Sequence, residues 1–231
     1  MAASYHNSAV VKKRHFDLAR PTGISLVVLA MLPLVIMPLL SIFIFGLSKG
    51  PLHFWEALVN PAAIFSLKLS LLTSSVATIC NVIFGIIAAW VMTKYEFRGD
   101  SALMIIISLP TAIPTAVAGF ALLLLWGPFG LIGRFLEATE WQVMFTTAAI
   151  ILANIFVTFP LAFGTIKPAL ENFDTNLEEA AETIGASRWQ AFRYVVLPSL
   201  RSAIVTGALL TFARSIGEFG STIMVDRKSV V

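Results

Sequence analysis

The sequence EEAAETIGASRWQAFRYVVLP occupies residues 178–198 and is the longest polar-rich insert between apolar runs. It begins with acidic residues, contains a central glycine, Gly185, and ends at Pro198. Long apolar runs precede and follow it. Because the rest of the chain is so apolar, we predict that this segment lies outside the membrane and docks onto a partner protein. The alternative is an ordinary loop lying on the bilayer surface.

The composition predicts an integral membrane protein. Of the 231 residues, 58% are hydrophobic and only 13% are charged, against roughly 25% charged residues in soluble domains. These charges are too few to cover a soluble domain of this size. The apolar runs are about 20 residues or longer, as membrane-crossing helices require, and they lack the alternation of barrel strands. We therefore expect an all-α, polytopic membrane protein.

Five apolar runs predict five membrane spans. Residues 1–22 form a polar N-terminal segment, residues 23–225 the membrane domain with its polar loop at 164–198, and residues 226–231 a tail of unusual sequence. The predicted spans cover residues 23–46, 64–92, 102–126, 143–163 and 200–225, with loops at 47–63, 93–100 and 127–142.

The distribution of basic residues predicts the orientation. Lysine and arginine concentrate in the short loops on the cytoplasmic side of bacterial membrane proteins. One predicted side carries Lys12, Lys13, Arg14, Arg20, Lys94, Arg98, Lys167, Arg188, Arg193 and Arg201, and the other carries only Lys49 and Arg134 before the tail. The N-terminus and the polar loop are therefore expected in the cytoplasm. Arg227 and Lys228 do not fit this rule, because five spans place them outside.

The polar loop is expected to contain two short helices. Thr175 and Glu178 match a capping box at a helix start, and the following glutamates favour the positive end of the helix dipole. Gly185 allows a sharp turn before a second, amphipathic helix. Pro168 and Pro198 are predicted to mark the two ends of the loop.

Arg214 and Glu218 form a charged pair in the predicted fifth span. They lie four residues apart and so share one helix face. Ionisable residues within a span are functional candidates because they need a polar surrounding. We predict that Arg214 supplies a positive potential that attracts an anion and that Glu218 restrains this potential. An uncompensated arginine would form a tight site that traps the anion. Mutual neutralisation, or pinning of a neighbouring helix, is the alternative.

The start of the predicted third span is rich in proline and threonine. Pro110 and Pro114 each free a backbone carbonyl, and broken backbone at membrane depth is tolerated against protein or a water-filled cavity. Thr111 and Thr115 are spaced on one helix face, so this region either lines a pathway or is a simple kink. The predicted pathway residues are Arg214, Glu218, Ser215, Thr211, Thr115 and Thr111. A second stripe, Lys68, Ser70, Thr73 and Asn81, is attributed to helix packing.

Several chemistries are not expected of this chain. No GxxxxGK[ST] phosphate loop occurs, so ATP is not expected to bind here in that way. The three histidines are scattered without metal spacing, and Cys80 lies alone in an apolar run. We therefore expect no catalytic residues, no metal and no cofactor. An intramembrane enzyme or a passive channel remains an alternative to a driven transporter.

The motif Glu179-Ala180-Ala181, followed by Gly185, Val195 and Leu197-Pro198, resembles the EAA loop of the membrane subunits of ABC importers. Only Val195 departs from that pattern, replacing isoleucine. In that family the short helix sits in a groove of a separate ATP-binding subunit. The resemblance therefore implies that these seven residues dock onto an ATPase, which would hold ATP and Mg²⁺.

Three further stretches, residues 92–99, 109–119 and 211–221, resemble sulfate/thiosulfate permeases, especially their T-type subunit. The related molybdate and tungstate permeases share Gly217-Glu218-Phe219-Gly220, so they are the alternative. The resemblance implies a bacterial inner-membrane importer with a second permease subunit and a periplasmic or lipid-anchored binding protein. It also implies a sixth span, whereas residues 226–231 do not resemble one. We therefore expect a truncated C-terminus.

Overall fold

The computed structural model describes residues 19–95, 98–128, 130–137 and 144–218. All regular structure in these ranges is helical, as predicted from the composition. Contacts divide the chain into two compact units, residues 1–64 and 65–231, which are described separately. The unusual tail at 226–231 lies outside the described residues.

The first unit contains helix α1 (Ala19–Leu47) and helix α2 (Pro51–Val59). Pro33 and Pro38 lie inside α1 without ending it. The α1 side chains are apolar and exposed around the helix; Leu29 and Phe45, for example, are 78% and 77% exposed. A helix that is apolar on all sides needs an apolar surrounding. The exposed apolar side chains of α1 are therefore suited to contact with lipid. The predicted loop at 47–63 is wrong in part, because Pro51 starts α2 there and α3 already begins at Pro61.

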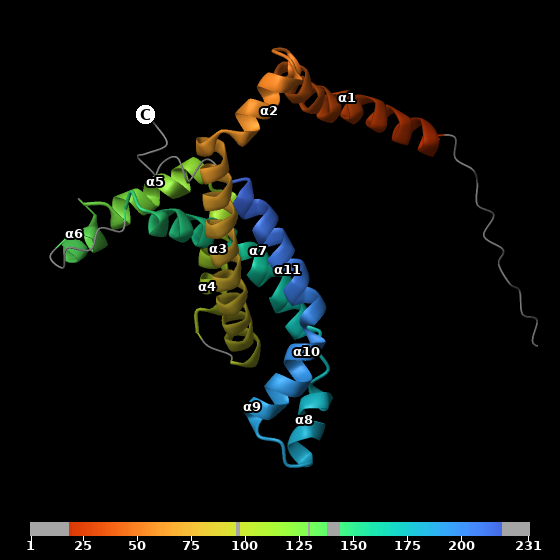
Figure 1. Cartoon of the computed structure of the whole chain (residues 1–231). Coiled ribbons are helices and arrows are strands. Elements are labelled where there is room, and N and C mark those ends of the chain that lie inside the picture. Colours follow the sequence, from red (N-terminus) through yellow and green to blue (C-terminus); the bar gives the residue numbers. More distant parts are fainter. Residues whose placement is uncertain (1–18, 96–97, 129, 138–143, 219–231) are drawn as a thin grey trace, which may run out of the picture. The chain divides into compact units, whose positions relative to one another are not determined.

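The second unit is a helical bundle followed by a segment of short helices (Figure 1). Its long helices are α3 (Pro61–Lys94, which begins in the first unit), α4 (Asp100–Ala112), α5 (Thr115–Trp126), α7 (Thr147–Glu171) and α11 (Arg201–Ile216). The short ones are α6 (Leu131–Glu137), α8 (Thr175–Thr183), α9 (Arg188–Ala191), the π-helical turn η1 (Phe192–Val196) and α10 (Leu197–Ser199).

Helix α7 is the element on which the other long helices of this unit pack. Helices α4, α5 and α11 all contact it. Ala162 of α7 is fully buried between two glycines, with Gly85 of α3 and Gly207 of α11 close to it. A Cβ added at Gly207 would lie 2.4 Å from the hydroxyl of Thr165 and 3.4 Å from Ala162 Cα. Small residues at such positions let helix backbones approach closely, as is usual in membranes.

A buried hydrogen bond also joins α3 to α7. Asn81 Nδ2 donates to Thr158 Oγ1 at 2.8 Å, and Thr158 Oγ1 donates to the Asn154 carbonyl at 2.7 Å. Thr73 and Asn81 are buried, so the packing role predicted for these two is confirmed. Lys68 and Ser70 are exposed on the same helix, so the part of the chain that the structure describes does not pack against them.

The predicted third span, residues 102–126, is wrong as a single helix. The backbone leaves the helical conformation at Ile113, with φ −99° and ψ 137°, and at Pro114. Pro114 has no N–H to donate and disfavours a helical conformation at the residue before it. Pro110, by contrast, lies inside α4. Thr111 and Thr115 therefore belong to two helices rather than to one face of a single helix.

The bounds of the last two spans also differ from the prediction. Helix α7 starts at Thr147, not at 143, and continues through Pro160 and Pro168 to Glu171. The polar loop is consequently shorter than 164–198, and Pro168 does not mark its start. The predicted fifth span begins as α11, which ends at Ile216, and residues 219–225 lie outside the described part of the chain.

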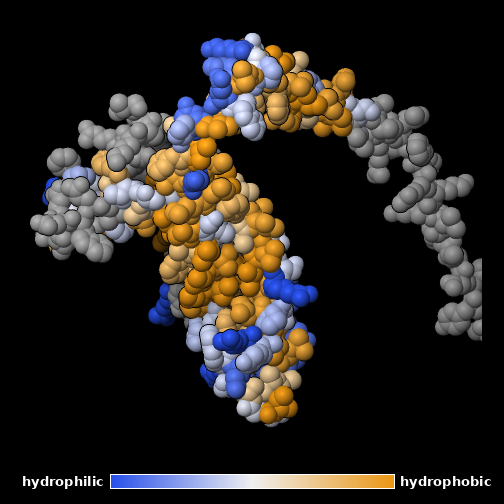
Figure 2. Space-filling view, viewed as in Figure 1, coloured by the Kyte–Doolittle hydropathy of each residue, from blue (hydrophilic) through white to orange (hydrophobic). Residues whose placement is uncertain are grey.

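Within the described residues, four candidate spans are long and apolar enough to cross a membrane: Ser25–Leu47, Pro61–Lys94, Thr115–Phe135 and Thr147–Glu171. A fifth arises if the bent pair Arg188–Ser199 and Arg201–Ile216, which meet at 65°, counts as one span. Figure 2 shows hydrophobic side chains covering the middle of the larger unit, whereas hydrophilic side chains gather around its α8–α9 end. This distribution fits a bundle in lipid with a polar end in water.

Candidate functional site

A small cavity lies where the broken span meets α7 and α11. Its volume is about 130 Å³. It is lined by Pro110, Thr111, Ile113, Thr115, Val157, Leu161 and Arg214. The break at Ile113 and Pro114 thus opens onto a space that contains one arginine side chain and two threonines. Three of the six predicted pathway residues, Thr111, Thr115 and Arg214, come together here.

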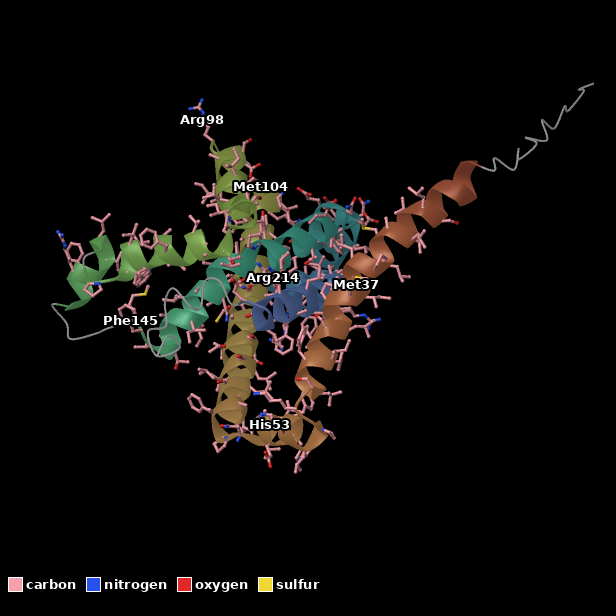
Figure 3. The ribbon with its side chains drawn as sticks, turned by 90° about the horizontal axis from the view of Figure 1, so that it is seen from above. Met37, His53, Arg98, Met104, Phe145 and Arg214 are labelled. Atoms are coloured by element: carbon pink, nitrogen blue, oxygen red, sulfur yellow. The ribbon has the colours of Figure 1, made fainter. Side chains whose placement is uncertain are left out.

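Among the described residues that line this cavity, Arg214 carries the single formal charge. The Arg214 side chain is 44% exposed, and its Nη1 lies 3.0 Å from Oε2 of Glu218, whose side chain is only 1% exposed. The carboxylate is therefore held inside the protein while the guanidinium remains accessible. Figure 3 shows Arg214 amid the helices of the larger unit, whereas Arg98 projects outward near the start of α4. The site can attract an anion, with a neighbouring carboxylate that offsets part of the charge.

Thr211 and Ser215 do not line this cavity. Both are buried on α11, in the same row as Gly207, which is the face that packs against α7. Arg214 lies on a more exposed face of the same helix. Both side chains thus lie in the contact between α11 and α7, and neither hydroxyl has a hydrogen-bond partner among the described residues.

Helix α8 presents most of its predicted docking residues to solvent. Glu179, Ala180 and Gly185 are exposed and Ala181 is half-buried, whereas Glu178 is buried. Leu177 and Ile184, at the two ends of the helix, are 50% and 87% exposed. An exposed face that combines apolar and acidic side chains is suited to a protein partner.

The start of α8 is capped differently from the prediction. The cap is Asp174, whose carboxylate accepts from the Asn176 backbone N–H at 3.0 Å. Thr175 is therefore the first helical residue, so the predicted capping box of Thr175 and Glu178 is wrong. Asp174 is as good a cap as threonine, and it precedes the helix by the one residue needed. A capping box does form at α9, between Ser187 and Gln190.

Gly185 makes the turn between the two short helices, as predicted. Its φ is +97°, a conformation that residues with a Cβ rarely adopt. A Cβ at Gly185 would meet no atom within 4 Å, so the requirement for glycine comes from the backbone alone. This turn reverses the chain between α8 and α9 at an exposed corner.

Residues 178–198 are called the docking segment below. Its second half continues into the bundle through an irregular helix. The π-helical turn η1 includes Val195, and α10 includes Leu197 and Pro198. Val195 and Leu197 are half-buried, and Pro198 is exposed. Val196 and Leu200 are buried against Ala89 and Met92 of α3 and against α7. The chain then bends by 65° into α11.

Lys94 and Trp90, which no sequence motif singles out, contact this segment. Lys94 Nζ lies 2.5 Å from Glu178 Oε2 and 5.2 Å from the ring centroid of Trp90. Trp90 in turn contacts Phe192 edge-on, with ring centroids 4.6 Å apart. Lys94 had entered only into the count of basic residues. Its partner lies 84 residues away, and no local pattern indicates a contact at that separation.

Comparison with known proteins places the chain in a family. Residues 81–229, more than half of the chain, match the family described as binding-protein-dependent transport system inner membrane component. The chain belongs to this family. The matched region includes the docking segment, Arg214 and the broken span, so this family membership covers every element of the site.

Individual relatives of this family member are sulfate permeases. The chain is 42% identical over 173 residues to the sulfate transport system permease protein CysT of Escherichia coli (strain K12), a match covering 75% of this chain and 62% of CysT. It is 36% identical over 204 residues to CysW of the same organism, covering 88% and 69%. The chain thus spans less than two thirds of the length of E. coli CysT.

The fold of this family member also occurs in a solved transporter. A bacterial alginate ABC transporter, crystallised with an alginate pentasaccharide-bound periplasmic protein, superposes with a TM-score of 0.68. Sequence identity is 19%, and the match covers 91% of this chain and 80% of that chain. At this identity the likeness establishes the helical permease fold.

Proposed function

We propose that the chain is the membrane-spanning subunit of an ATP-driven importer that carries sulfate or thiosulfate across a bacterial inner membrane. The observation that carries this proposal is the position of Arg214. Its guanidinium borders a cavity at the break between α4 and α5, opposite Thr111 and Thr115. A doubly charged, tetrahedral oxyanion suits such a lining, because the guanidinium and the Thr115 hydroxyl can donate hydrogen bonds to its oxygens. The Thr111 hydroxyl donates to the Ser108 carbonyl at 2.6 Å and lines the space beside them.

Partial compensation of Arg214 is what a conduit requires. Conduction needs an interaction that is favourable enough to admit the ion and weak enough to release it. The Glu218 carboxylate, 3.0 Å from Arg214, lowers the positive potential without removing it. We assign Arg214 and Thr115 to direct contact with the anion, Thr111 to the lining beside them and Glu218 to restraint of Arg214. Thr211 and Ser215 support the pathway by keeping α11 in place.

We infer that the docking segment couples transport to ATP hydrolysis. We propose that α8, the Gly185 turn and the Val195–Pro198 stretch bind a separate ATP-binding subunit in the cytoplasm, with the N-terminus on the same side. ATP and Mg²⁺ are held by that subunit, and hydrolysis occurs there. Its closure on ATP moves the segment and opens the pathway toward a substrate-loaded binding protein. The likeness to CysW, a second permease of the sulfate system in E. coli, supports a heterodimer with a related permease.

Uptake measurements test this function. The gene is expressed with its partner permease, ATPase and binding protein in a host that lacks sulfate permeases and is grown with sulfate as sole sulfur source. We expect growth and ATP-dependent uptake of radiolabelled sulfate, with competition by thiosulfate. Competition by molybdate or tungstate but not by thiosulfate would instead favour the alternative cargo. Uptake that persists without the ATPase would contradict a driven importer.

A further inference from the structure

Besides the packing of Val196 against α3 and α7, the docking segment contacts the last turns of α3 through two further side chains. These come from different parts of the segment. Glu178 of α8 bonds to Lys94, and Phe192 of η1 packs on Trp90. Trp90 and Lys94 lie four residues apart and contact one another through the cation–π interaction. Both attachments therefore meet at one patch of α3.

The ion pair is the polar half of this attachment. The Glu178 side chain is 11% exposed and that of Lys94 is 29% exposed. Glu178 is the buried carboxylate of α8, while Glu179 and Glu182 face solvent. A half-buried pair is screened by water and salt less than an exposed one, and it fixes distance and direction between two elements. Lys94 also lies in the last turn of α3, where a cation is favourable to the helix dipole.

The aromatic half of the attachment continues from Trp90 into the second short helix. Phe192 also stacks on Trp189, with centroids 5.6 Å apart and planes 27° apart. Trp189 is itself 66% exposed, at the outer side of the segment. A displacement applied to α9 therefore reaches α3 through packed rings, and one applied to α8 reaches it through the ion pair.

From α3 the connection continues to the cavity through contacts already described. Gly85 packs against Ala162, and Asn81 bonds to Thr158, so α3 and α7 are held in register. Helix α7 contributes Val157 and Leu161 to the cavity lining. The contacts between α3 and α7 thus connect the elements that an ATPase would move to the elements that line the cavity.

We propose that Lys94 and Glu178 are a positioning pair that transmits movement of the docking segment to α3, and through α3 to the cavity. This inference rests on the proposed function as a permease subunit. It assigns the pair neither to ATPase binding nor to contact with the anion. Its specific consequence is that breaking the pair lowers the amount of anion moved per ATP hydrolysed while the ATPase stays bound.

The test measures transport and ATP hydrolysis together in proteoliposomes that contain the whole complex. The variants are Lys94→Glu, Glu178→Lys and the charge swap that combines them. We expect each single variant to lower transport per ATP by at least about fivefold, the lower end of typical coupling between sites. The swap should restore the ratio to within about twofold of the original. Equal co-purification of the ATPase with all variants verifies that docking itself is unchanged.

Lys167 and Glu171 provide a matched control. They form an ion pair within α7, four residues apart, so they join no separate elements. Lys167→Glu, Glu171→Lys and their swap should leave transport per ATP unchanged. If these variants uncouple as strongly as those at Lys94 and Glu178, or if the Lys94 and Glu178 single variants keep the original ratio, the inference is wrong. A swap that does no better than the single variants would also overturn it.

Hydrogen exchange separates this inference from the proposed cargo. On adding ATP to the purified complex, the original chain should change its amide exchange in both α8 and the last turns of α3. Lys94→Met should keep the change in α8 and weaken it in the last turns of α3, where the Trp90–Phe192 contact remains. A complex that moves no oxyanion but shows this pattern would refute the proposed cargo and retain the transmission. A complex that moves sulfate but shows the same exchange changes in the original chain and in Lys94→Met would support the proposed cargo and refute the transmission.

Discussion

Arg214 and Glu218 form an ion pair of very unequal burial: the carboxylate is 1% exposed and the guanidinium 44%. The pair therefore leaves a cation at the surface of the cavity and its compensating charge behind it. Neutralising either partner should change anion handling in opposite ways, which makes the pair informative about the pathway.

Replacing Arg214 by methionine removes the cavity's cation while keeping much of the side-chain volume. Hydrogen bonds to charged groups contribute about 1.5–3 kcal/mol, so we expect sulfate uptake at low concentration to fall roughly 10- to 100-fold. Initial rates across a range of sulfate concentrations measure this. Arg98→Met, at an exposed arginine that points away from the bundle (Figure 3), is the control and should transport normally. Undiminished uptake by Arg214→Met would remove this residue from the pathway.

Replacing Glu218 by glutamine leaves Arg214 without its compensating charge. We expect tighter retention of the anion, so that KM and the maximal rate of uptake both decrease. The same rate measurements show the effect, and Arg214→Lys, which keeps the charge, should fall between the original chain and Arg214→Met. A raised KM for Glu218→Gln would mean that the carboxylate organises the site rather than restraining it.

Gly185→Asp should uncouple ATP hydrolysis from transport while the chain still inserts into the membrane. At φ +97° any residue with a Cβ is strained by roughly 1–2 kcal/mol, so the turn that presents α8 must distort. Uptake, ATPase activity and membrane content are compared for each variant. Gly164→Ala is the control, since this helical glycine is exposed with no atom near an added Cβ. Normal transport by Gly185→Asp would refute the docking role.

The two glycines that flank Ala162 should respond differently to alanine. At Gly207 the added Cβ would lie 2.4 Å from Thr165 Oγ1, whereas at Gly85 its nearest neighbours are at an ordinary 3.5 Å. Overpacking costs about 1–3 kcal/mol, so Gly207→Ala should lower the unfolding temperature of the purified complex. Gly85→Ala should leave it unchanged or raise it slightly. Equal behaviour of the two variants would contradict the close approach of α11 to α7.

Thr158→Val should destabilise the bundle by removing the acceptor of the buried Asn81 amide. Hydrogen bonds between membrane helices contribute about 0.6 kcal/mol on average and up to about 1.7 kcal/mol. Unfolding in mixed detergent measures the loss. Asn81→Leu combined with Thr158→Val should cost less than the sum of the two single changes. Strict additivity would show that the two side chains do not interact in the membrane.

Much of the fold could be predicted because the length and apolar composition of membrane helices identify them in a sequence. The span at 64–92 and the helix–turn–helix around Gly185 agree with α3, α8 and α9. The errors occur where proline was interpreted from local rules alone. Pro168 lies inside α7, whereas Pro114 lies at the break before α5. Whether a helix accommodates a proline depends on the neighbouring helices and on whether the proline lies in the first turn.

The candidate site was predictable only in part, and for a different reason. Thr111, Thr115 and Arg214 could be chosen because polar residues are conspicuous in an apolar run. Lys94 could not, because a lysine at a helix end is unremarkable until a folded structure brings Glu178 to it. Helix spacing also could not tell that Thr211 faces a neighbour while Arg214 faces the cavity.

The π-helical turn at Phe192–Val196 changes the helical phase between the docking segment and α11. One extra residue in a turn rotates everything beyond it by about 100° around the axis, and π-helical turns recur at functional sites. Deleting Arg193 or Tyr194 would keep the contact residues themselves but shorten the distance between Gly185 and Val195, and it should swing Phe192 and Trp189 away from Trp90. The number of residues between Gly185 and Pro198 therefore sets how the short helices face α3, separately from the identity of any residue within that stretch.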